Sequence, residues 1–422
     1  MSRADPTGLP DGGTVVISGI GVVSPLGNSA PAVAARYAAG ETAIAPLEGV
    51  ASGFGALVPD IPLEVVPAEA RARGGRLDRL CRLFLSAAYL AVADARLEIP
   101  ADDAARVGLA FGTGLGCLLT NAEYNRKLVE HGPAAASPRL FAYTVSSAAA
   151  GEVSIALGIK GPNLTAHQGV AAGLGALGYA YDAIRTGKAD VMLAGGADAL
   201  GEALVRGLAD MRLLKARSAP TAFGETTPGL CPSEGAAVMV LERTDRAHAR
   251  GARPWARLAG YAAGFEPTLT RRERDPAAVT ATMQRALTAA GAAPAAIDLV
   301  VTSAHATAVD AVERAALATV FSSVSPVLLA PKVAWGECFA AHGPLAVALA
   351  AALMREPALL TRDARALALD TAGGVASATA EHRRAAAQRG AGDAEPGVRG
   401  PLAMVHTLCY SGPTVVLVLQ PE

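Results

Sequence analysis

The chain has 422 residues, of which 51% are hydrophobic and 18% are charged, and its formal net charge is −1. This composition excludes a disordered chain, and the near-zero charge gives no reason to expect a nucleic-acid partner. No stretch reaches about 18 consecutive apolar residues, so we expect no membrane span, and the N-terminus lacks the apolar core of a secretion signal. The five cysteines have no metal-binding spacing, which favours reduced thiols in a cytoplasmic protein without a metal or cofactor.

Apolar strands alternate with helices in the first part of the chain. The opening "TVVISGIGVVSPLG" is a β-branched strand followed by a Gly-Pro turn, and "RLCRLFLSAAYLAVADARL" has apolar residues at helical spacing. Such alternation is typical of an α/β protein whose sheets are covered on both faces. We predict strands in residues 14–27, 106–116, 190–199 and 236–247, and helices in residues 79–97 and 146–159.

The second part of the chain repeats this order, which indicates an internal duplication with two α/β halves, residues 14–250 and residues 251–422. The polar, Ala- and Gly-rich segment at residues 378–401 is interpreted as a surface loop or a mobile insertion. We predict strands in residues 256–265, 297–306, 327–333 and 414–420, and helices in residues 275–292, 311–321 and 342–354.

Five segments in this order carry a family resemblance: "VVISGIGVVSPLGN", "GLAFGTGLG", "AAAGEVSIALGIKGPN", "ADVMLAGGADA" and "SEGAAVMVLERTDRAHARGARPWARLAGY". Together they resemble the elongating β-ketoacyl-acyl carrier protein synthases, which have the thiolase fold. The resemblance covers nearly the whole chain, from Thr14 to Gln420. It implies two duplicated α/β halves in a layered α-β-α-β-α arrangement.

The resemblance implies a nucleophilic cysteine at a helix N-terminus, and this chain lacks one. Counted without gaps from Gly161 and Pro162, the family's cysteine position falls on Val170. A local shift would instead bring Gln168 to that place, a residue that chain-length factors of polyketide systems often carry there. Neither side chain can attack a thioester, so covalent catalysis of the family kind is not expected on this chain.

The family's first histidine follows a strand, and His305 stands at the matching place in "DLVVTSAHAT". Asp310 and Glu313 match an acidic pair that follows it, although the intervening loop is shorter than in the family. Two interpretations of His305 remain open. It either has a catalytic role or is a structural histidine that caps the end of a strand.

The family's second histidine is replaced by an acidic residue. In "PKVAWGECFAAHGPLA", Lys332 and Gly336 match the family pattern, and Glu337 occupies the histidine position. An anionic side chain there would oppose an enolate instead of stabilising it. The favoured interpretation is that Glu337 pairs with Lys332 or caps the following helix.

The resemblance also implies a flexible glycine-rich gate near the C-terminus, where this chain has "CYSGPTV" from Cys409. Gly412 keeps its family identity, while Tyr410 and Pro413 restrict the backbone where the family has glycine. Cys409 lies near the expected mouth of the site. A relocated nucleophile is one interpretation of this cysteine, and a buried free thiol is the favoured one.

Two further sets of positions follow from the resemblance. Asn163, Thr165 and Gln168 belong to a strand and turn expected at the interface of a two-fold dimer. Leu115 and Leu140 match sites near the end of the acyl tunnel and the dimer seam. The alternative for both leucines is an ordinary place in the core.

A scaffold that is kept without its chemistry is expected to bind. We therefore predict a chain-length factor that pairs with a catalytic ketosynthase and shapes its acyl tunnel, in a type II fatty acid, polyketide or polyene pathway that uses acyl carrier protein. Two alternatives stay open. One is an enzyme with altered chemistry, a decarboxylase or acyltransferase that uses His305, and the other is a homodimeric protein that binds acyl carrier protein.

Overall fold

The structure is a computed structural model of the chain. It describes residues 14–49, 53–74, 77–215, 220–224, 229–267, 274–362, 366–369, 374–388 and 400–422.

The N-terminal half of the chain forms five adjacent strands of a mixed sheet. The first three in spatial order are antiparallel neighbours, and the last two join by parallel pairing. Nearly every residue of the first four strands is buried, which explains their continuous apolar sequences. In spatial order the five strands are β1 (Val15–Val23), β7 (Gly235–Arg243), β6 (Val191–Asp198), β4 (Val107–Gly112) and β5 (Asn163–Ala166).

The C-terminal half repeats the same spatial order and the same strand directions. This correspondence confirms the predicted duplication of an α/β unit. The two first strands pair with each other, Val15 opposite Leu258, so that the halves join in one 12-stranded sheet. The repeated strands are β8 (Ala256–Phe265), β14 (Pro413–Gln420), β13 (Leu402–Leu408), β9 (Ile297–Val301) and β10 (Val327–Leu329).

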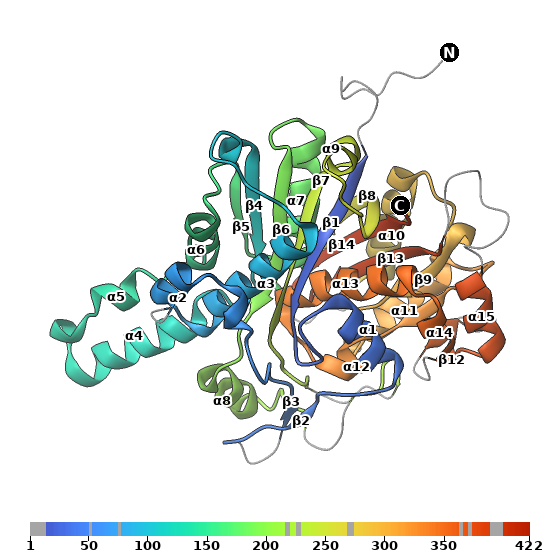
Figure 1. The fold of residues 1–422 in the computed structure, drawn as a ribbon. Helices are drawn as coiled ribbons and strands as arrows, with labels where there is room; N and C mark the ends of the chain where they lie inside the picture. The colour runs from blue at the N-terminus through green and yellow to red at the C-terminus, as the bar shows by residue number, and fades with distance from the viewer. Residues whose placement is uncertain are drawn as a thin grey trace.

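Helices separate and cover the two half-sheets (Figure 1). The central pair, α7 and α13, packs in the largest core cluster together with side chains from both halves. Thirteen of the 14 residues of α13 are buried, and this explains a helix that is apolar on all sides. These layers confirm the predicted α-β-α-β-α arrangement. The covering helices are α3 (Arg79–Ala95) and α6 (Ala148–Leu157) on the N-terminal half and α10 (Pro276–Ala290) and α11 (Ala308–Val320) on the C-terminal half; the central ones are α7 (Ala172–Arg185) and α13 (His342–Arg355).

The outermost strands of the two halves differ. β5 ends the sheet on one side, whereas β10 is followed by β11 (Leu367–Leu369) and β12 (Val375–Ser377). Beside them lies α15 (Ala380–Gln388), whose His382 Nε2 is 2.7 Å from the carbonyl oxygen of Ser325. The interpretation of residues 378–401 as a loop is therefore wrong for residues 380–388, since they form a helix that is anchored through His382 to the segment before β10. Residues 389–399 of that segment lie outside the described residues.

Sequence analysis missed a helical arm that extends from the N-terminal half (Figure 1). The arm consists of α4 (Leu118–His131) and α5 (Pro138–Phe141). Only one residue of α4, Thr120, is fully buried, so the helix carries no strong apolar periodicity. The remaining elements are α1 (Ala30–Ala38), α2 (Ala68–Gly74), α8 (Glu202–Asp210), α9 (Thr244–Ala249), α12 (Lys332–Trp335), α14 (Ala358–Arg362), β2 (Ala45–Pro46), β3 (Phe54–Gly55) and short 3-10 turns, including η4 (Gly169–Ala171) and η6 (Phe339–Ala341).

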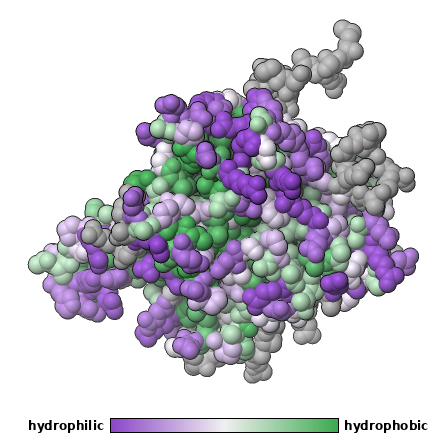
Figure 2. Space-filling view, viewed as in Figure 1, coloured by the Kyte–Doolittle hydropathy of each residue, from purple (hydrophilic) through white to green (hydrophobic). Residues whose placement is uncertain are grey.

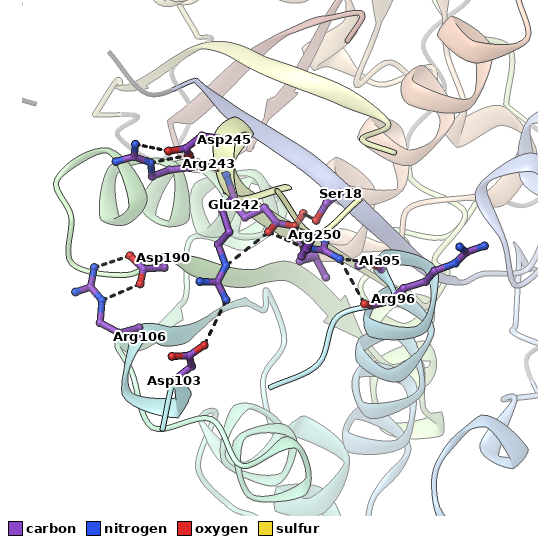
Figure 3. A network of polar contacts seen from close by, with 12 residues as sticks. Ser18, Ala95, Arg96, Asp103, Arg106, Asp190, Glu242, Arg243, Asp245 and Arg250 are labelled. Atoms are coloured by element: carbon purple, nitrogen blue, oxygen red, sulfur yellow. Dashed lines mark hydrogen bonds and ion pairs between the residues drawn. The ribbon is translucent and has the colours of Figure 1, made fainter. Parts of the chain in front are cut away.

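The segment that links the halves is held by buried ionic contacts (Figure 3). The fully buried Glu242 carboxylate on β7 accepts from the Arg250 Nε atom at 3.0 Å. Arg250 also donates to the carbonyl oxygen of Ala95, at the end of α3, at 2.6 Å. Trp255 then stacks under Arg355, whose guanidinium carbon is 3.7 Å from the ring centroid. The exact division into residues 14–250 and 251–422 stays a prediction.

Candidate ketosynthase-like site

The expected nucleophile position lies in the turn between β5 and α7. Val170, in η4, is 3% exposed and packs into the central core cluster. Gln168 is exposed, and a Cβ atom at Gly175 would come within 2.5 Å of its Oε1, so its amide lies against the start of α7. The buried Val170 side chain therefore contains only hydrocarbon. It has no nucleophilic atom and cannot attack a thioester.

Cys409 lies directly against this turn. Gly169 has a φ of +58°, and a Cβ atom there would be 2.7 Å from the Cys409 Sγ atom. The Cys409 side chain is nearly buried, and its sulfur lies 3.2 Å from the Ser411 hydroxyl. A hydroxyl is no general base, so this contact does not activate the thiol.

His305 follows β9 and is 3% exposed. Its Nε2 atom is 3.0 Å from the Tyr410 hydroxyl, and its Nδ1 atom is 3.4 Å from the Ser303 carbonyl oxygen. Burial, and then the positive charge of Lys332, holds the pKa of His305 well below its usual value. The neutral ring therefore donates from Nδ1 and accepts the Tyr410 proton at Nε2, which leaves neither nitrogen free for a substrate.

Glu337 forms a buried ion pair with Lys332. The Lys332 Nζ atom is 2.7 Å from Glu337 Oε2 and 3.1 Å from the Ser303 hydroxyl, and both charged side chains are at most 1% exposed. The other Glu337 oxygen accepts from the backbone nitrogen of Phe339, the first residue of η6, at 3.0 Å. The structure thus contains both contacts of the favoured interpretation, pairing with Lys332 and capping of the following turn.

The acidic pair after His305, Asp310 and Glu313, accepts hydrogen bonds from backbone nitrogens of the loop around His305. Asp310 accepts from the backbone nitrogens of Ala306 and Thr307, at 2.8 and 3.1 Å, and so holds the short loop in place. Glu313 accepts from the Ser303 nitrogen at 2.7 Å and contacts the His406 ring. Sequence reasoning missed His406 and Ser303, because neither belongs to a recognisable motif.

The gate segment is a tight turn between β13 and β14. Gly412 has a φ of +114°, and a Cβ atom there would lie 2.0 Å from the Glu266 carbonyl oxygen, so only glycine fits. The buried Arg274 donates to the carbonyl oxygens of Cys409 and Gly412, at 2.9 and 2.7 Å. Pro413 begins β14 and accepts from the Cys409 nitrogen at 2.9 Å. Arg274, which the sequence did not single out, thus clamps a turn already restricted by Pro413.

Leu115 and Leu140 are both half-buried, so the alternative of ordinary core leucines is wrong for both. The fully buried Asp198 carboxylate accepts from the Leu115 and Ala340 nitrogens, each at 2.8 Å, which ties the Leu115 loop to η6. Leu140, in α5, lines a cavity of about 340 Å³ between α3, α4 and α5. Leu140 is therefore half-buried because one side of it faces this open space.

The edge beside β5 is open and apolar. Asn163 is exposed and donates to the Ser154 hydroxyl at 2.8 Å, while Thr165 is half-buried. Figure 2 shows apolar surface on the side where α6 and β5 lie. Large apolar residues are exposed there and on the arm, namely Phe141 at 63%, Val145 at 53% and Ile155 at 62%.

Two family models match the chain. The model described as the β-ketoacyl synthase N-terminal domain matches residues 13–247, and that of the C-terminal domain matches residues 255–361. The chain belongs to the β-ketoacyl synthase family. Among the described residues of this ketosynthase-family chain, no helix is long and apolar enough to cross a membrane, and no group of three metal-ligating side chains is found.

Relatives and solved structures agree with this assignment. The 3-oxoacyl-acyl-carrier-protein synthase 2 of Vibrio cholerae is 30% identical over 305 residues, covering 69% of this chain and 73% of that protein. Its counterpart from Synechocystis is 31% identical and covers 59% and 62%. The fold is similar to a β-ketoacyl synthase of Burkholderia phymatum, with a TM-score of 0.80, 23% identity, and coverage of 97% of this chain and 100% of the other. It is equally similar to the ishigamide ketosynthase/chain length factor, with a TM-score of 0.79, 23% identity, and coverage of 97% and 99%.

Proposed function

We propose that this chain is a non-catalytic ketosynthase-like subunit, a chain-length factor, that pairs with a catalytic ketosynthase and shapes its acyl tunnel. The proposed pathway is a type II fatty acid, polyketide or polyene synthesis that uses acyl carrier protein. The observation that carries the proposal is Val170, a buried hydrocarbon side chain in the helix-initiating turn where the family resemblance expects the nucleophile.

The surrounding polar groups support the same proposal. His305 is hydrogen-bonded to Tyr410, and Glu337 is paired with Lys332, so each polar group is satisfied within the chain. Arg274 in addition clamps the gate turn. Because the His305 ring and the Glu337 carboxylate are engaged by residues of the chain itself, these two positions are poorly suited to stabilise a developing enolate or oxyanion.

The open edge at β5 supports pairing with another subunit. An unpaired edge strand beside exposed apolar side chains is a liability unless a partner covers it. One structural neighbour is described as a ketosynthase/chain length factor, and another as a type II acyl-carrier protein in complex with its ketosynthase bound to the hexaketide. Both descriptions are consistent with a ketosynthase partner and an acyl carrier protein for this chain.

The proposal predicts that a neighbouring gene encodes an intact ketosynthase, and the test is co-expression of this chain with that ketosynthase, followed by mass measurement of the complex and of each subunit after acyl loading. We expect a heterodimer that buries more than about 2,000 Å² in total, with acyl groups on the partner alone. A stable acyl adduct on this chain, at Cys409 for example, would instead favour an enzyme with altered chemistry. A well-folded monomer that does not bind the ketosynthase would overturn the proposal.

A further inference from the structure

The cavity that Leu140 lines has a mixed character. Leu77, Leu119 and Leu140 provide its apolar lining, while three arginines, Arg79, Arg82 and Arg139, provide positive charge from α3 and α5. A tunnel for a pure hydrocarbon chain would be expected to end in apolar side chains only. The charged groups therefore need an explanation of their own.

The acidic groups around the cavity already have partners. Asp78 accepts from the Cys81 backbone nitrogen at 2.9 Å and from the Thr120 hydroxyl at 2.7 Å. Glu123 accepts from Lys127 at 2.7 Å. The carboxylates thus have no need of a ligand's donor groups.

The three arginines are not equivalent. Arg79 is occupied, because it pairs with Glu234 and donates to the Val58 carbonyl oxygen at 2.9 Å. Arg82 is half-buried and donates from Nε to the Leu77 carbonyl oxygen at 2.9 Å, which anchors the guanidinium at the cavity. In the part of the chain that the structure describes, the terminal nitrogens of Arg82 have no protein acceptor, and Arg139 makes no hydrogen bond.

We propose that this cavity receives a chain that carries acceptor oxygens, and that Arg82 selects such a chain over a hydrocarbon chain of the same length. A guanidinium offers donors in a rigid plane and accepts nothing, so carbonyl or carboxylate oxygens satisfy it. A hydrocarbon in the cavity would displace water from Arg82 and leave its donors unpaired. This inference rests on the proposed function and specifies the chemistry of the chain that the subunit accommodates.

The test measures binding to the complex of this chain with a ketosynthase whose nucleophilic cysteine has been replaced. The two matched probes are the N-acetylcysteamine thioesters of 3,5-dioxohexanoate and of hexanoate. We expect the dioxo probe to bind more tightly, and Arg82→Met to lose about tenfold in its affinity without weakening the hexanoyl probe, since a hydrogen bond to a charged group is at stake. Arg126→Met is the matched control, because Arg126 is exposed on α4 and outside the cavity lining.

The outcomes separate the inference from the proposed function. Equal affinity for both probes, or a ratio unchanged in Arg82→Met, overturns the selection by Arg82 even if Leu140 variants alter product length. Inorganic phosphate serves as the third probe. If phosphate binds with the same dependence on Arg82 and the dioxo probe does not compete, the cavity is a site for a free anion and the inference fails. If no heterodimer forms, the same three titrations on the full chain alone still decide the role of Arg82.

Discussion

The outer edges of the two halves differ although the halves share one strand order. β5 ends the sheet with an open edge, and exposed apolar residues such as Ile155 lie near it. The equivalent strand β10 is covered by β11 and β12, and α15 docks beside them. On the C-terminal side β10 is therefore paired on both sides and the sheet ends only at the short strand β12, whereas on the N-terminal side β5 itself is the last strand.

The same contrast holds for polar groups. The C-terminal half supplies His305, Lys332, Glu337 and Tyr410, and these side chains satisfy one another. The N-terminal half supplies the cavity between α3, α4 and α5, where the terminal nitrogens of Arg82 have no acceptor among the described residues. The comparison shows that the two copies of the duplicated unit differ in their outer strands and in how their polar side chains are paired, and the proposed function assigns the partner to the N-terminal copy.

The largest effect is expected from breaking the cluster of His305, Lys332, Glu337 and Tyr410, which is called the closed cluster below. Lys332→Met should lower the free energy of unfolding by about 3–5 kcal/mol, because Glu337 would remain buried and charged without its partner. Urea denaturation measures the change, with Arg36→Met as the control, since Arg36 and Glu41 form an exposed pair worth about 1 kcal/mol or less. The double variant Lys332→Met, Glu337→Leu should recover most of the loss. If Lys332→Met loses no more free energy of unfolding than Arg36→Met, the buried pair of Lys332 and Glu337 does not stabilise the cluster and the prediction is wrong.

A charged side chain introduced beside β5 tests the open edge. Ile155→Lys should weaken the complex with the ketosynthase by about 30-fold or more, the effect of losing one interface hot spot of about 2 kcal/mol. Ser377→Lys, on the exposed strand β12 at the opposite end of the sheet, is the matched control and should leave assembly unchanged. Dissociation constants from surface-immobilised ketosynthase give the comparison. Equal effects of both variants would remove the distinction between the two edges.

The closed cluster should also make stability depend on pH. Burial, and then Lys332, holds the pKa values of His305 and His342 well below the usual value of about 6.5, so below that pH the unfolded chain binds more protons than the folded one. The contribution of the two histidines to the free energy of unfolding is therefore fully present above pH 6.5. As the pH decreases from 6.5, the free energy of unfolding should fall by about 1.4 kcal/mol per pH unit for each histidine. Unfolding midpoints between pH 7.5 and 5.5 check this slope. His342→Ala should reduce it, whereas removal of the exposed His131 should not, and a flat profile would contradict the prediction.

The smallest effect on stability is expected at the cavity. A buried leucine replaced by alanine usually loses about 2–5 kcal/mol, and Leu140→Ala should lose less because one side already faces open space. In the complex, Leu140→Ala should shift products toward longer chains and Leu140→Phe toward shorter ones, as mass spectrometry of the products would show. Unchanged product length in both variants, with the complex intact, would exclude Leu140 as a length determinant.

Much of this molecule follows from its sequence. The strand predicted at residues 256–265 has those same bounds, and the apolar run at residues 342–354 is the central helix α13. The absence of a nucleophile at Val170 and the acidic side chain of Glu337 are visible in the residues themselves. These features depend on local periodicity and on residue identity, which need no knowledge of tertiary contacts.

Only the tertiary structure decided which polar groups meet. Arg274 clamps the carbonyl oxygen of Cys409 across 135 residues of sequence, and Tyr410 reaches His305 across 105. The open edge at β5 likewise depends on the final order of all strands in the sheet. No periodicity encodes such contacts, because they arise when the two duplicated halves pack α7 and α13 between them and bring distant segments to one place.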